Sequence, residues 1–71
     1  MSGYRVEVDG SEGWRVLILD ASGRQVFERA CPSEVEARTF ASTVEQHLGW
    51  LSEEKFRRYY RLPDPEGPVK E

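Results

Sequence analysis

The apolar residues of this chain change their spacing at Pro32, and this change constrains the fold more than any other feature. Residues 4–8 alternate apolar and charged side chains and residues 14–19 form a short, β-rich apolar run, whereas after Pro32 the apolar residues recur every three or four positions. A period of two is typical of half-buried strands, and a period near 3.6 is typical of amphipathic helices. The chain is therefore predicted to form strands first and helices second.

Three strands are expected before Pro32. Residues 4–8 alternate apolar and charged side chains, and residues 14–19 are apolar on both faces toward their end. Residues 24–31 return as a third strand, which Pro32 ends because proline cannot continue a hydrogen-bonded ladder. Asp20 and Gly23 occupy the first and fourth positions of a type I turn, with Gly23 left-handed in a bulged hairpin. These signals predict an antiparallel meander.

A helix is expected directly after Pro32. Ser33 and Glu36 have the spacing of a capping box, in which each side chain satisfies a backbone donor at the start of a helix. Gly49 is predicted to end this helix in the left-handed conformation, with Trp50 folding back over the last turn. The apolar stripe of this helix consists of Ala37, Phe40, Ala41, Val44, Leu48 and Leu51.

A second, shorter helix is expected from Ser52 to about Arg61, with Leu51 and Phe56 forming a hydrophobic staple. The order β-β-β-α-α describes an α+β fold, in which a three-stranded antiparallel β-meander packs on one helix and a short second helix follows. We expect a single α+β domain over residues 1–62. Residues 63–71 are rich in proline and are expected to form a flexible C-terminal tail.

Composition excludes several functional classes. The 71 residues carry a formal net charge of −3, which argues against nucleic-acid binding through bulk charge. No apolar run approaches the roughly 18–20 residues of a membrane span, so no membrane association is expected. The single cysteine, Cys31, cannot form an internal disulfide and suits a reducing, cytoplasmic compartment. Arginine predominates over lysine, which is compatible with a GC-rich genome, and we expect a protein of bacterial or phage type.

Residues that could carry catalysis are few. Cys31 and His47 could form a thiolate–imidazole pair, but nothing in the sequence brings them together. One histidine and one cysteine cannot supply the four nitrogen and sulfur ligands of a typical zinc site. No phosphate-binding or dinucleotide-binding glycine motif is present. We therefore expect neither an enzyme nor a cofactor or metal site.

The expected hairpin register defines a candidate partner surface. If Asp20 pairs with Arg24, then Ile18 faces Val26, Val16 faces Glu28 and Trp14 faces Ala30 on the helix side of the sheet. The opposite side then holds the candidate partner-binding residues Leu17, Leu19 and Phe27, with Arg15 and Arg29 beside them.

Three interpretations of this patch remain open. It forms a contact surface for a protein partner or a second copy of the chain, because exposed apolar clusters mark interaction sites. Alternatively, the second helix covers it through Phe56, Tyr59 and Tyr60. In the third interpretation the register is shifted by one residue, which exchanges the two faces.

The second helix carries a basic and aromatic segment over residues 55–61. Guanidinium groups bind phosphates and aromatic faces stack on bases, so this composition resembles an anion-binding or nucleic-acid-binding surface. The candidate anion-binding residues are Lys55, Arg57, Arg58 and Arg61. Glu53 and Glu54 precede Arg57 and Arg58 by four residues and are expected to neutralise them partly. The other interpretation is an amphipathic helix whose aromatic residues dock on the core.

Residues 4–48 resemble the small arm-type DNA-binding domain of tyrosine recombinases, a three-stranded sheet followed by one helix. The resemblance is carried by Trp14-Arg15-Val16, by the turn from Asp20 to Gly23-Arg24, and by Ser33-Glu34-Val35-Glu36-Ala37 leading to Phe40. That family inserts its sheet into the major groove. The resemblance implies that the DNA-facing residues are Arg5, Arg15, Arg24, Gln25 and Arg29.

The sequence thus predicts a small non-enzymatic protein-interaction module that can self-associate through the open sheet face as a homodimer. The alternative is a small DNA-binding protein that uses the three-stranded sheet and its arginine side chains. The exposed Leu17, Leu19 and Phe27 favour the first hypothesis, because the sheets of the arm-type domains are usually rich in lysine and arginine.

Overall fold

A computed structural model describes residues 3–63 and confirms the predicted α+β fold. The strands are β1 (Arg5–Asp9), β2 (Trp14–Leu19) and β3 (Gln25–Cys31), and they form an antiparallel sheet in the order β1-β2-β3. Two helices follow, α1 (Glu34–Trp50) and α2 (Glu53–Tyr60). The tail predicted over residues 63–71 lies, beyond Pro63, outside the described residues. Within residues 3–63 neither helix is long and apolar enough to cross a membrane.

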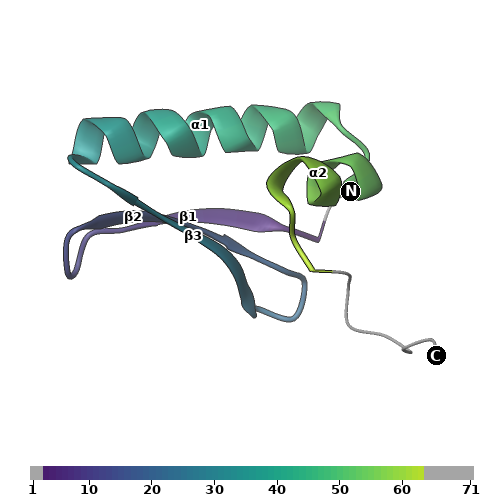
Figure 1. Ribbon diagram of the computed structural model, residues 1–71, viewed down its shortest axis with the longest axis horizontal. Coiled ribbons are helices and arrows are strands. Elements are labelled where there is room, and N and C mark those ends of the chain that lie inside the picture. The colour runs from purple at the N-terminus through teal and green to yellow at the C-terminus, as the bar shows by residue number, and fades with distance from the viewer. Residues whose placement is uncertain (1–2, 64–71) are drawn as a thin grey trace.

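Helix α1 lies along one face of the sheet, and α2 closes one end of the same layer (Figure 1). Val16 and Ile18 of the central strand are fully buried against Ala37 and Val44 of the helix. Alanine at position 37 has a short side chain, which lets the helix approach the strand closely. The core therefore forms where the period-two pattern of β2 meets the apolar stripe of α1.

The register of the β2–β3 hairpin differs from the prediction beyond its first pair. Leu19 pairs with Gln25 as expected, but a β-bulge follows and Ile18 pairs with Phe27 instead of Val26. Because side chains alternate along a strand, one extra residue turns every later side chain of β3 to the other face. The predicted placement of Phe27 on the open face is therefore wrong, and Phe27 stacks on Phe40 of α1 with ring centroids 6.2 Å apart.

The same bulge moves three further residues. Glu28 was expected opposite Val16 on the helix side, but it pairs with Leu17 on the open face. Arg29 was expected opposite Arg15, but it pairs with Val16 and lies 4.8 Å from the centroid of the Phe40 ring, on the helix side. Ala30 was expected on the helix side, but it pairs with Arg15 on the open face and is exposed. The physical reason is burial, because the shifted register brings the large Phe27 ring into the core instead of leaving it in water.

The end of α1 also differs from the prediction. Ser33 caps the start as expected, since its hydroxyl accepts the N–H of Glu36 at 3.3 Å. Gly49 does not end the helix, which continues to Trp50, and Leu51 then becomes extended. The Leu51 N–H still donates to His47 O at 2.8 Å, so no left-handed residue is needed there. Trp50 consequently points outward and is 75% exposed.

Helix α2 packs on the core through Phe56 and through Leu51, which directly precedes its cap. Ser52 caps it by accepting the N–H of Lys55 at 3.2 Å, and Leu51 packs on the same core cluster as the fully buried Phe56. Phe56 contacts the Tyr4 ring with a centroid distance of 5.4 Å. The helix thus extends the core beyond the end of α1. Of the predicted patch it covers Phe27, which Tyr60 contacts edge-on at 5.7 Å on the helix side of the sheet.

Candidate partner-binding groove

The predicted partner patch on the open sheet face is not formed. Phe27 has turned to the helix side, and Leu19 is only 9% exposed. Leu17 remains half-buried on the open face, where its neighbours on the adjacent strands are Glu7 and Glu28. A single leucine between two carboxylates is an ordinary feature of a sheet with one solvated face.

The charges of the open face bind one another. The Arg15 guanidinium donates to Asp9 and, at 2.6 Å, to Glu28. The hydrogen bond from Arg15 is the main reason that the pKa of Asp9 lies below its ordinary value, and the pKa of Arg15 is raised in turn. Because both partners of Arg15 are carboxylates of the same sheet, its cation is locally neutralised. The open face therefore offers little positive charge to a ligand.

A groove lies on the other side of the molecule, between β3, α1 and α2. It has a volume of about 340 Å³ and takes residues from all three elements. We call it the aromatic groove. Its lining consists of Phe27, Arg29, Phe40, Thr43, His47, Tyr59, Tyr60 and Arg61.

Tyr60 organises the aromatic groove. Its ring meets Phe27 edge-on at 5.7 Å and lies 5.0 Å from Phe56, which anchors it to the core. Its hydroxyl is 2.7 Å from Nδ1 of His47, so the second ring nitrogen of His47 is the one that can meet a ligand. Burial raises the pKa of the Tyr60 hydroxyl, with a smaller contribution from Tyr59. The neutral hydroxyl therefore persists through the physiological pH range.

Two large aromatic residues stand exposed beside His47. Tyr59 is 62% exposed and its ring centroid lies 4.7 Å from that of His47, while Trp50 is 75% exposed at 6.3 Å. Scattered single apolar residues are normal on a protein surface, but adjoining exposed rings are a feature of binding sites. Tyr59 also borders a smaller hollow formed with Leu51, Lys55 and Arg58.

The cations predicted to bind anions do not form one site. Arg57 and Arg58 approach Glu53 at 3.9 Å and Glu54 at 2.9 Å, as their spacing predicted. Arg61 lines the aromatic groove together with Arg29, and neither makes an ion pair within residues 3–63. Lys55 lies beside Tyr59 on the outer surface of α2. No carboxylate lines the aromatic groove, so its two arginines set its charge.

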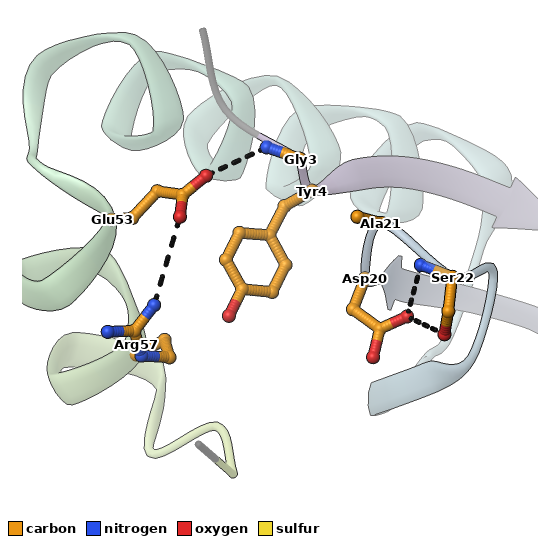
Figure 2. Close-up of a pocket in the computed structure, with 7 residues that line it drawn as sticks. All are labelled: Gly3, Tyr4, Asp20, Ala21, Ser22, Glu53 and Arg57. Atoms are coloured by element: carbon orange, nitrogen blue, oxygen red, sulfur yellow. Dashed lines mark hydrogen bonds and ion pairs between the residues drawn. The ribbon is translucent and has the colours of Figure 1, made fainter. Parts of the chain in front are cut away.

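Arg57 points into a different hollow, near the N-terminus (Figure 2). Glu53 accepts the Gly3 N–H at 2.8 Å there, and Asp20 accepts the N–H and hydroxyl of Ser22. The hydroxyl of Ser22 is the main reason that the pKa of Asp20 lies below its ordinary value. Both carboxylates that line this hollow of about 200 Å³ thus bind groups of the chain itself.

No known protein family, curated protein sequence or solved structure matches this chain. The resemblance to arm-type DNA-binding domains stays a prediction.

The residues considered for catalysis are not gathered by the fold. Cys31 lines a hollow beside Pro32, whereas His47 lines the aromatic groove. Within residues 3–63 no cluster of three histidine, cysteine or acidic residues could hold a metal ion.

Sequence reasoning missed His47, Trp50 and Phe40 as members of the site. One signal was available, because His47 and Trp50 are three residues apart and share a face of α1. The contacts of His47 with Tyr59 and Tyr60 depend on how α2 folds back.

Proposed function

We propose that this protein is a small, non-enzymatic interaction module of bacterial or phage type that acts in the cytoplasm. It binds a protein partner through the aromatic groove. The lone Cys31 supports the reducing compartment, because no internal disulfide is possible.

The exposure of Trp50 and Tyr59 next to His47 is the observation that carries this proposal. Burying such rings stabilises a complex strongly, and tryptophan, tyrosine and arginine dominate the residues whose truncation most weakens protein interfaces. Tyrosine and arginine line this groove, and Trp50 stands next to it against His47, on elements that Tyr60 ties to the core. A rigid, preformed surface loses little conformational entropy on binding.

The positive charge of the aromatic groove favours a partner with an acidic surface. Arg29 and Arg61 line the aromatic groove without a lining carboxylate, although the chain as a whole has a net charge of −3. A partner surface that carries aspartate or glutamate complements this local charge and is steered toward it.

The DNA-binding alternative and self-association both rested on the sheet, and no observation favours either. Arg15 is held by Asp9 and Glu28, and Arg24 lies 3.3 Å from Asp20. Arg29 has moved to the helix side. The face that would enter a DNA groove thus has few unneutralised cations, and phosphate binding depends on such cations.

Site-specific photocrosslinking tests the proposal. A photoreactive phenylalanine derivative replaces Tyr59, and in a matched control it replaces Arg38, whose side chain is 67% exposed and does not line the groove. In cells that express the protein naturally, we expect a discrete protein adduct from position 59 only. Equal adducts from both positions, or adducts to nucleic acid alone, would contradict the proposal.

A further inference from the structure

The aromatic groove runs beside a strand with an unpaired edge. Strand β3 pairs only with β2 in the described sheet, so its outer edge presents main-chain N–H and C=O groups. A second hollow of about 500 Å³ continues along the same strand toward Cys31 and Pro32. The two hollows share Arg29, Phe40 and Thr43, so they form one continuous groove along β3.

A second copy of the chain is a poor occupant of this edge. Antiparallel pairing of β3 with its own copy about a two-fold axis sets one residue opposite itself. Near the middle of the strand that residue is Glu28 or Arg29, and like charges directly opposite each other destabilise a sheet. Charged residues on an edge strand are a known device against such self-pairing. The free edge therefore suits a different strand.

Side-chain alternation specifies what a different strand must carry. Phe27 and Arg29 project from β3 toward the groove, because both lie on the helix side of the sheet. A residue opposite Arg29 on an added strand meets a guanidinium without an ion-pair partner in the described chain, which favours a carboxylate. The residue two positions away meets the rings of Phe27 and Tyr60, which favours an aromatic side chain.

The other residues that line the groove are compatible with an acidic and aromatic peptide. Thr43 donates its hydroxyl to the carbonyl of Thr39 at 3.2 Å, so its methyl group is available for contact. The one carboxylate along the groove, Glu36, lines the far hollow near Pro32. Negative charge is thus favoured at the Arg29–Arg61 end.

We propose that an extended acidic peptide segment of a partner protein binds as a fourth strand along β3. It places a carboxylate opposite Arg29 and an aromatic side chain, two residues away, over Phe27 and Tyr60. This inference rests on the proposed function and specifies the partner segment. Main-chain hydrogen bonds supply affinity in this mode, and the side chains in the groove supply specificity.

A random heptapeptide library displayed on yeast is the probe. Sorting against the fluorescently labelled full chain is expected to enrich peptides with an acidic and an aromatic residue two positions apart. Against Arg29→Gln, enrichment of the acidic position should disappear. Arg38→Gln is the matched control, because Arg38 is exposed and pairs with Glu34 outside the groove lining. Enrichment of basic peptides, or no enrichment, overturns the proposal.

The strand geometry is tested with one enriched peptide. Bound peptide should slow hydrogen exchange at every second amide of β3, where donors point outward. N-methylation of the peptide amides that face β3 should abolish binding, whereas methylation of the intervening amides should not. Slowed exchange confined to α1 or α2, or equal effects of both methylation sets, overturns the fourth-strand proposal. In that case a position-59 adduct would leave the proposed function standing.

Nucleic acid is the competing occupant. A fluorescein-labelled oligothymidylate is titrated against the chain, and we expect no saturable change in anisotropy at moderate salt. Saturable oligothymidylate binding that displaces the enriched peptide would overturn the assignment of this groove to a peptide.

Discussion

At the scale of single residues, Arg61 is the one non-glycine residue with positive φ among residues 3–63. It adopts φ 57° and ψ 42°, so that α2 can end and Leu62 can reach the core. A side chain in this conformation costs about 1–2 kcal/mol, part of which glycine would recover. We expect Arg61→Gly to raise the free energy of unfolding by roughly 0.5–1 kcal/mol in urea titrations. The same substitution should lower the yield of the photocrosslinked adduct formed from position 59. A less stable variant would show that the arginine side chain itself supports the fold.

The hydrogen bond between Tyr60 and His47 gives a second prediction at this scale. Tyr60→Phe removes it and should lower the free energy of unfolding by about 0.5–1.5 kcal/mol near neutral pH. The pKa of Tyr60 is raised above its ordinary 10.0 in the fold, so the unfolded chain ionises first as pH rises. The stability contributed by this shift is complete below pH 10 and is lost as pH rises through the folded-state pKa. Urea titrations at about pH 8 and pH 11 should show that the free energy of unfolding falls less between these pH values in Tyr60→Phe than in the wild-type chain. An equal fall in both proteins would contradict this account.

At the scale of elements, α2 has one buried side and one exposed side. Phe56 is fully buried, and truncating a buried phenylalanine costs roughly 3–5 kcal/mol. Phe56→Ala should therefore lower the melting temperature severely. Arg58 pairs with Glu54 at an exposed site, so Arg58→Ala should change stability by no more than about 0.5 kcal/mol. Thermal melts of the two variants provide the comparison, and similar melting temperatures would show that α2 is not part of the core.

The elements themselves were predictable because their signals are local. Asp20 and Gly23 form the expected turn, with the Gly23 N–H 2.9 Å from Asp20 O and Gly23 at φ +90°. The bulge after Leu19 was not predictable from the turn. It forms only if the free energy gained when Phe27 packs on Phe40 exceeds the free energy lost where the bulge interrupts the hydrogen bonds between β2 and β3. The groove was missed for the same reason. Its members come from β3, α1 and α2, and only tertiary packing brings them together.

At the scale of the whole molecule, charge is distributed unevenly. The chain is acidic overall, yet no carboxylate lines the aromatic groove, while the open face holds the three carboxylates Glu7, Asp9 and Glu28 beside the two cations Arg5 and Arg15. The two sides of the molecule therefore present different electrostatic surfaces. An acidic partner is attracted to one side and repelled by carboxylates on the other, which restricts its orientation on approach.

This asymmetry yields a prediction about association. Of the three apolar residues of the predicted patch, Leu17 alone is both half-buried and on the open face, where it lies between Glu7 and Glu28. One partly covered leucine removes too little apolar surface from water to hold two copies together. Light scattering should therefore give the monomer mass of 8.2 kDa. Leu17→Lys should leave that mass and the position-59 adduct unchanged, since the new ammonium faces two carboxylates. A dimer that Leu17→Lys dissociates would return the interface to the open sheet face.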